Sequence, residues 1–170
     1  MPKAHAASAI PTRILAPIDF SPSSHAALKM AVELARHFHA GIHLVHVIPM
    51  FPVTSLPDYV PEAKFLEEAR KDAERQFVKC QADLRAKEIK VSSSIEVGND
   101  VPGCILDVIE REKIDMVVIS THGMTGWHPL VFGSIAEKVV KLADCPLLLL
   151  RSKKPVSSAK VKPVRMMEWW

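Results

Sequence analysis

The sequence predicts an α/β domain built on one doubly wound, five-stranded parallel sheet with helices on both faces. Two observations carry this prediction. Short, mostly apolar runs alternate along the chain with longer segments in which apolar residues recur every three or four positions. Strands that are continuous apolar runs between amphipathic helices are typical of a parallel sheet that is covered on both faces. Right-handed crossovers then join successive strands.

The first half of the chain opens with an apolar strand and a well-marked helix. The run RILAPI (13–18) predicts a buried strand. Ser21 is a typical N-cap, with Pro22 in the first turn, and an apolar stripe continues to Phe38. Gly41 is expected to take the left-handed conformation that ends this helix. Further strands are expected at 42–48, 89–97, 115–119 and 146–150, and further helices at 62–88, from Asp100 as N-cap onward, and at 134–143.

Length and composition favour one globular domain. The chain has 170 residues, of which 48% are hydrophobic and 24% are charged, unlike a disordered chain. Such a chain buries enough surface to fold without a metal or disulfide. We expect a flexible leader over residues 1–12, the folded domain over 13–151, and a basic C-terminal tail over 152–170.

The net positive charge of the chain comes from its two ends. The formal net charge is +3, yet the last twenty residues contribute +5 and Lys3 contributes +1, so the remainder is slightly acidic. Sequence-specific nucleic-acid binding needs a basic face on the folded domain, so we expect no nucleic-acid partner. The tail is expected to be mobile, or to dock on a partner, an anionic membrane surface or a second subunit.

The cysteines and the hydropathy of the chain indicate the cellular compartment in which the protein is expected. The three cysteines are an odd number and lack C-x-x-C spacing, which excludes a disulfide scaffold and a thiolate zinc site. No apolar stretch approaches the roughly 18 residues of a membrane span. We therefore expect a cytoplasmic protein without a membrane span.

Catalytic and metal-binding motifs are not indicated. The chain lacks the P-loop pattern G-x4-G-K-[ST] and the dinucleotide pattern G-x-G-x-x-G. His37 and His39 project in different directions on a helix, and His43 and His46 fall on opposite faces of a strand, so no metal site is expected. His122 is interpreted as structural rather than as a catalytic base. We expect a binding protein with at most slow hydrolysis.

A ligand is expected beyond the carboxyl ends of the strands, where doubly wound sheets bind their ligands. Asp19 follows the first strand, and its carboxylate can accept a hydrogen bond from an amino group or a ribose hydroxyl. Gly133 and Ser134 open the last helix, where unpaired N–H groups and the helix dipole attract an anion such as phosphate. These features together predict a nucleotide site. The simpler interpretation is that Ser134 caps its helix and that Asp19 forms an Asx-turn.

Five segments of the chain resemble the universal stress protein family, in register over residues 13–151. They are Ile14–Ser21, Val45–Val47, Val118–Gly126, Val131–Val139 and Cys145–Arg151. Nucleotide-binding members of that family carry G-x2-G-x9-G-[ST] after the fourth strand. This chain keeps the spacing from Ser120 through Gly123 to Gly133 and Ser134, but Ser120 replaces the first glycine. Met124 stands where many relatives have arginine, which favours weaker or less phosphate-dependent binding.

The resemblance implies an adenine-nucleotide-binding regulator of the stress response, with an adenine nucleotide alpha hydrolase-like fold, rather than a true catalyst. It implies that Asp19 and the backbone of Val47 hold adenine, and that the turn 120–123 holds the ribose and the α-phosphate. Residues 133–135 would hold the distal phosphates. ATP is the expected ligand, with AMP or ADP as alternatives, and Mg²⁺ would be held by the phosphates. The predicted binding set comprises Pro17, Ile18, Asp19, Val47, Ser120, His122, Gly123, Gly133, Ser134 and Ile135.

The last predicted strand, Leu147–Leu150, is an apolar edge that would favour aggregation if it stayed uncovered. Pairing with the same strand of a second chain satisfies this edge, and the resemblance implies such a homodimer. A protein client is also expected. Two alternatives stay open at this point, namely an interaction module of the same fold that needs no nucleotide, and a slow ATPase.

Overall fold

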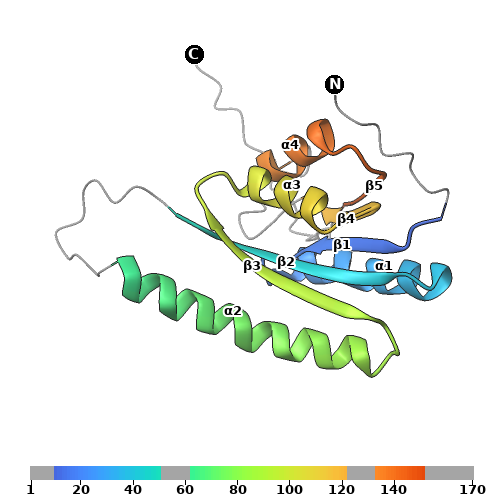
Figure 1. Ribbon diagram of the computed structural model, residues 1–170, viewed down its shortest axis with the longest axis horizontal. Helices are drawn as coiled ribbons and strands as arrows, with labels where there is room; N and C mark the ends of the chain where they lie inside the picture. Colours follow the sequence, from blue (N-terminus) through green and yellow to red (C-terminus); the bar gives the residue numbers. More distant parts are fainter. Residues whose placement is uncertain (1–9, 51–61, 122–132, 152–170) are drawn as a thin grey trace, which may run out of the picture.

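A computed structural model describes residues 10–50, 62–121 and 133–151. These residues form five strands and four helices in the predicted alternating order (Figure 1). The strands are β1 (Arg13–Pro17), β2 (Gly41–Pro49), β3 (Val91–Gly98), β4 (Met116–Ser120) and β5 (Leu147–Leu150), and the helices are α1 (Pro22–Phe38), α2 (Glu62–Arg85), α3 (Val101–Arg111) and α4 (Ser134–Leu142). Most of the predicted leader and tail lies outside the described residues.

The strands form one parallel sheet in the order β3-β2-β1-β4-β5, which confirms the doubly wound fold. The chain winds outward from β1 toward β3 and then returns to add β4 on the other side. The strand order therefore reverses between β1 and β4, which is where such sheets bind ligands. Because Pro17 at the end of β1 pairs with Val45, the last residues of β2 extend past β1 on this side. This overhang forms one wall of the site.

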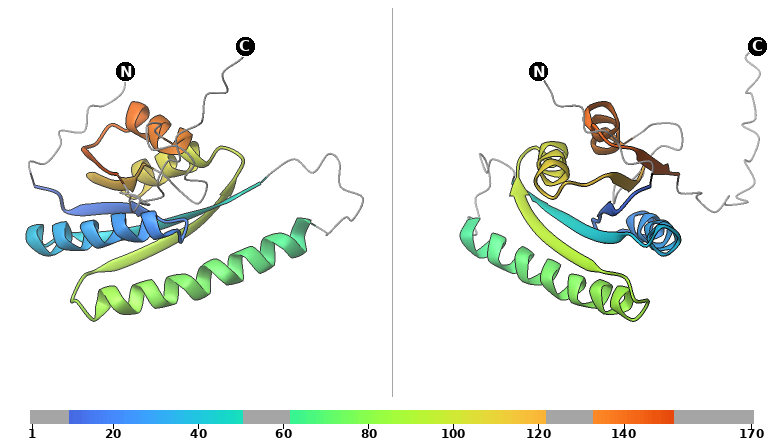
Figure 2. Two further views of the ribbon diagram at one scale, coloured as in Figure 1. Left: turned by 180° about the vertical axis from the view of Figure 1, so that it is seen from behind. Right: turned by 45° about the vertical axis from the view of Figure 1, so that its right-hand side comes forward.

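Each face of the sheet carries two helices. Helices α1 and α2 cover one face, and α3 and α4 cover the other (Figures 1 and 2). Side chains alternate along each strand between the two cores: Ile14 and Leu44 pack toward α1 and α2, whereas Leu15 and Val45 pack toward α3 and α4. These strand residues are at most 1% exposed. The continuous apolar runs of the central strands follow from this burial on both faces.

The C-terminal end of α1 and the start of α3 differ from the prediction. Ser21 is the N-cap of α1, and its hydroxyl accepts a hydrogen bond from the N–H of Ser24, as predicted. However, His39 rather than Gly41 takes the left-handed conformation, with φ of 56°. The helix ends at Phe38, where its apolar stripe ends, and Gly41 already belongs to β2. Asp100 occupies the N-cap position of α3, but its side chain makes no capping hydrogen bond and instead faces Lys138 of α4.

Within the described part of the chain, we find no helix that is both long and apolar enough to cross a bilayer. Cys80, Cys104 and Cys145 all carry free thiols. Burial raises the pKa of each of these thiols, which favours the unreactive protonated form.

A buried histidine links β2 to the edge strand β3. His43 is 3% exposed, and its two ring nitrogens lie 2.8 Å from the Ser92 hydroxyl and 3.2 Å from the Ser94 hydroxyl. Burial lowers the pKa of this imidazole. Arg13 and Arg111 lower it further, whereas Glu112 and Glu96 raise it. The folded protein therefore resists protonation of His43.

We expect the free energy of unfolding to decrease as the pH falls below about 6.5, the ordinary pKa of histidine. In this range the unfolded chain binds a proton on His43, whereas the folded protein binds it only at a lower pH. Urea unfolding at several pH values from 7 to 5 measures this effect. The variant His43→Gln, which keeps hydrogen-bonding groups for the two serines, should show a shallower slope. Equal slopes would show that His43 does not contribute.

Candidate functional site

A cavity of about 360 Å³ lies at the carboxyl edge of the sheet, where the strand order reverses. Its volume is near the lower end of the roughly 300–1,000 Å³ typical of ligand sites. Eight of the ten predicted binding residues line it, although they come from three strand ends and one helix start. They are Pro17, Ile18, Asp19, Val47, Ser120, Gly133, Ser134 and Ile135. The other two, His122 and Gly123, lie outside the described residues.

Sequence reasoning missed most of the apolar wall of the cavity. Val101 and Ile105 of α3 and Ile119 of β4 line the cavity, as do Thr121 and His46 near the strand ends. Ile105 recurs with Val108 and Ile109 at three-residue and four-residue spacing, which is typical of the inward face of a helix. It did not distinguish a residue that packs in the core from one that borders a cavity. The wall offers an apolar surface against which a flat ligand, such as a purine base, can pack.

Asp19 lies where β1 ends, and part of its carboxylate is already engaged. Its Oδ1 accepts hydrogen bonds from the backbone N–H of Ser21 at 3.0 Å and from the Ser21 hydroxyl at 2.5 Å. This is the Asx-turn of the simpler interpretation. The same residue also lines the cavity, so the turn holds the carboxylate in place at the wall. Asp19 can therefore both form the Asx-turn and contact a ligand in the cavity.

Ring contacts stabilise the turn that carries Asp19. Phe20 has a φ of 61°, which is unusual for a bulky residue. Its ring packs between those of His46, at a centroid distance of 4.8 Å, and Phe77 of α2, at 5.7 Å. His46 Nδ1 also lies 2.8 Å from the carbonyl oxygen of Ile18, to which it donates a hydrogen bond. These contacts fix the backbone on both sides of Asp19.

Replacing His46 with leucine should lower the free energy of unfolding by about 1–3 kcal/mol, because the Ile18 carbonyl loses its donor. The variant His46→Asn carries an amide N–H close to the position of Nδ1 and should recover part of this loss. Chemical denaturation of the three proteins tests this expectation. If asparagine and leucine destabilise equally, the hydrogen bond to Ile18 does not hold the turn.

The glycine at the start of α4 lies very close to the backbone at the end of β4. Gly133 is the N-cap, and its N–H donates to the Thr121 carbonyl oxygen at 2.8 Å. A Cβ at this position would lie 2.8 Å from the same carbonyl oxygen. The glycine is therefore required by this close approach to the end of β4.

Among the described residues no side chain caps α4, and Ser134 is not its cap, which corrects the simpler interpretation. Ser134 is instead the first residue of the helix and is exposed at the cavity. The first N–H groups of a helix have no acceptor within the helix itself and are available to a capping group, a ligand or water. Helix starts attract anions through these groups and through the helix dipole.

Ser120, which stands at the first glycine position of the predicted motif, is the last residue of β4 and lines the cavity. Its side chain is half-buried, and the next residue, Thr121, is 5% exposed. The N–H of Thr121 donates to the Leu150 carbonyl at 2.9 Å, which aligns the ends of β4 and β5. Ser120 is thus part of the cavity wall, together with the residues at the start of α4.

Comparison with known proteins agrees with this fold and motif. The model of the Universal stress protein family matches residues 11–151. The chain belongs to the universal stress protein family. The universal stress protein MJ0531 of Methanocaldococcus jannaschii is 31% identical over 146 residues, which cover 84% of this chain and 83% of that protein. The universal stress protein YxiE of Bacillus subtilis is 32% identical over 146 residues, which cover 82% of this chain and 98% of that protein.

Solved structures of the family show the same fold. The protein MJ0577 is 26% identical with a TM-score of 0.75, covering 85% of this chain and 98% of its own. A universal stress protein from Burkholderia pseudomallei is 25% identical with a TM-score of 0.67, covering 82% and 95%. The shared core is the parallel sheet with its four helices. The family is therefore established on sequence and on structure together.

Proposed function

We propose that this universal stress protein binds an adenine nucleotide in the cavity at the carboxyl edge and regulates a protein client according to occupancy. The observation that carries the proposal is the uncapped start of α4, which shares one cavity with the Asp19 carboxylate and an apolar wall. An anion site, a hydrogen-bond acceptor and an apolar surface are the three features that an adenosine phosphate requires.

In this proposal each part of the nucleotide has its own contacts. Asp19 and the Val47 backbone hold the adenine, and Pro17 and Ile18 border it. The turn 120–123 holds the ribose and the first phosphate, and residues 133–135 hold phosphate oxygens. ATP, ADP and AMP all share these features. Mg²⁺, where present, is held by the phosphates, since the cavity offers Asp19 as its acidic side chain among the described residues.

Two solved universal stress proteins support the proposal. One, from Archaeoglobus fulgidus, is described in complex with dAMP, and another is described in complex with cAMP. Their TM-scores are 0.58 and 0.57. They share the fold with this chain at 20% and 17% identity, so the ligands belong to those proteins. Adenine nucleotides are thus compatible with this architecture.

We further propose that the protein is a cytoplasmic homodimer. Strand β5 is at the sheet edge, and its four leucines are only half-buried. Val140 and Leu142 of α4 add exposed apolar surface, at 46% and 59% exposure. Pairing of β5 with its copy would extend the sheet and cover the edge. The reduced cysteines are compatible with the cytoplasm.

Extraction of bound nucleotide tests the proposed function. The purified protein is denatured with acid, and the supernatant is separated by anion exchange. An adenine nucleotide in a fixed ratio to protein is the expected result. An empty extract, together with no thermal shift on adding ATP and Mg²⁺ or AMP, would contradict the proposal and favour an interaction module that needs no nucleotide. Phosphate release above that of an Asp19→Ala control would instead indicate an ATPase.

A further inference from the structure

A row of polar side chains crosses from β2 to the edge strand β3, on the face of the sheet where Val45 packs toward α3. His43 of β2 is paired with Ser92 of β3, and Ser94 follows two residues later on the same face. His43 is 3% exposed, whereas Ser92 is exposed. The His43 ring nitrogens Nδ1 and Nε2 lie 2.8 Å from Ser92 Oγ and 3.2 Å from Ser94 Oγ. An exposed serine hydroxyl is therefore within hydrogen-bonding distance of a buried imidazole.

Glu96 of β3 fixes the direction of these hydrogen bonds. Its carboxylate accepts hydrogen bonds from Arg111 Nη2, at 2.5 Å, and from the Ser94 hydroxyl. Burial raises the pKa of Glu96, but these two donors outweigh burial and hold the pKa below its ordinary value. Because Ser94 has one hydroxyl proton and gives it to Glu96, Ser94 Oγ accepts from the Nε2–H of His43. In this neutral tautomer Nδ1 carries a lone pair, which accepts the hydrogen bond of the Ser92 hydroxyl.

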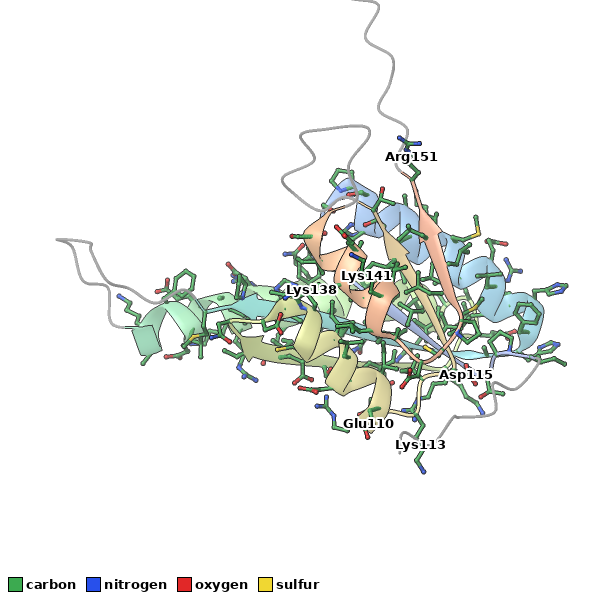
Figure 3. The ribbon with its side chains drawn as sticks, turned by 90° about the horizontal axis from the view of Figure 1, so that it is seen from above. Glu110, Lys113, Asp115, Lys138, Lys141 and Arg151 are labelled. Carbon is green, nitrogen blue, oxygen red and sulfur yellow. The ribbon has the colours of Figure 1, made fainter. Side chains whose placement is uncertain are left out.

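The surroundings of His43 keep its ring neutral, as a general base must be before it takes a proton. Burial lowers the pKa of this imidazole below its ordinary value. The two glutamates near the ring raise the pKa, and the two arginines lower it further. These four side chains are Glu112 and Arg111 at the end of α3, Arg13 of β1 and Glu96 of β3. Glu110 and Lys113, at the same end of α3, project outward from the molecule (Figure 3).

We propose that Ser92 is a nucleophilic serine that accepts an activated acyl group, such as that of an acyl phosphate or an aryl ester, with His43 as its general base. Ser92 Oγ bonds to the carbonyl carbon while its proton passes to His43 Nδ1. The bond from the carbonyl carbon to the leaving oxygen then breaks, and the leaving group takes the proton from His43. The products are an ester on Ser92 and a free phosphate or phenol.

This site is separate from the cavity and from the proposed dimer contact. Ser92 does not line the cavity. Strand β3 is one edge of the sheet, and β5, which ends just before Arg151 in Figure 3, is the other. Pairing of β5 with its copy would therefore leave Ser92 accessible, and the reaction of Ser92 does not depend on bound nucleotide.

Labelling with an alkyl fluorophosphonate tests the nucleophile, because an activated serine displaces fluoride and forms a stable bond to phosphorus. Mass spectrometry of peptides should find the label on Ser92. The variant His43→Gln should be labelled about 100-fold more slowly, with circular dichroism showing that it is folded. The matched control is His37→Gln, an exposed histidine on α1, which should keep the wild-type rate. An unlabelled Ser92, or equal rates in the wild type and His43→Gln, would overturn the proposal.

Two measurements complete the test, and the second needs no variant. With p-nitrophenyl acetate as acyl donor, the wild type should release p-nitrophenol faster than Ser92→Ala, and equal rates would overturn the proposal. The rate of fluorophosphonate labelling should stay constant from about pH 8 to about pH 6.5, the ordinary pKa of histidine. It should fall at lower pH, where His43 gains a proton. A rate that instead rises tenfold per pH unit above pH 6.5 would show that His43 is not the base.

Discussion

Gly133→Ala is expected to weaken nucleotide binding by about 100-fold and to lower the free energy of unfolding by about 1–3 kcal/mol. The added Cβ would lie 2.8 Å from the Thr121 carbonyl oxygen, which is backbone and has little freedom to move. Relief of this contact requires the start of α4 to shift away from the end of β4. The N–H groups of the first turn would move with it. Calorimetry with AMP and urea denaturation measure the two effects.

Gly103→Ala is the matched control for this prediction. A Cβ at Gly103 would also come within 2.8 Å of another atom, but that atom is Oδ2 of Asp100, the end of a movable side chain. Gly103 is inside α3 and does not line the cavity. Alanine is favoured over glycine in a helix by about 0.8–1 kcal/mol. Binding should stay unchanged and stability should not fall. Wild-type affinity in Gly133→Ala would contradict the role of α4.

Leu149→Pro is expected to convert the proposed dimer of about 38 kDa, twice the chain mass of 18.9 kDa, into a monomer. Val117 and Thr121 donate hydrogen bonds to the carbonyl oxygens of Pro146 and Leu150, so these alternate residues of β5 face β4. The backbone N–H of Leu149 therefore points to the open edge. Proline removes this N–H and blocks pairing with a second β5, while the bonds to β4 are kept. Light scattering coupled to size-exclusion chromatography measures the mass.

Leu149→Ala separates edge pairing from loss of packing. Leu149 packs partly against the core between the sheet and α3 and α4, and both substitutions remove these contacts. Alanine keeps the N–H, so this variant should remain dimeric. A substitution such as Leu148→Glu is less informative, because Leu148 packs toward α1 and a charge there would damage the core. A dimeric Leu149→Pro variant would place the dimer contact elsewhere.

The fold could be predicted because hydrophobic periodicity reports burial directly. The alternating polar and apolar residues of β3 are typical of a strand at a sheet edge, where β3 lies. The ends of the elements were less predictable. His39 takes a left-handed conformation for which glycine is usually preferred, and Phe20 does so because His46 and Phe77 hold its ring. Such conformations are set by tertiary contacts, which a local pattern does not contain.

The site was predicted in part, since the carboxyl ends of parallel strands must meet at one edge. That rule brought Asp19 and the start of α4 to a common cavity. It did not provide the contact between Gly133 and the Thr121 carbonyl, which depends on how closely α4 approaches β4. Nor did it provide the engagement of Lys138 by Asp100, which joins two helices remote in sequence. Both contacts depend on how the helices pack in three dimensions, which only coordinates show.

A crystal structure of the protein grown with AMP tests the central claim most directly. We predict an adenine next to Asp19 and Val47, and a phosphate within hydrogen-bonding distance of the backbone N–H groups at the start of α4. Density for AMP at any other place, or an empty cavity in crystals saturated with AMP, would contradict the account.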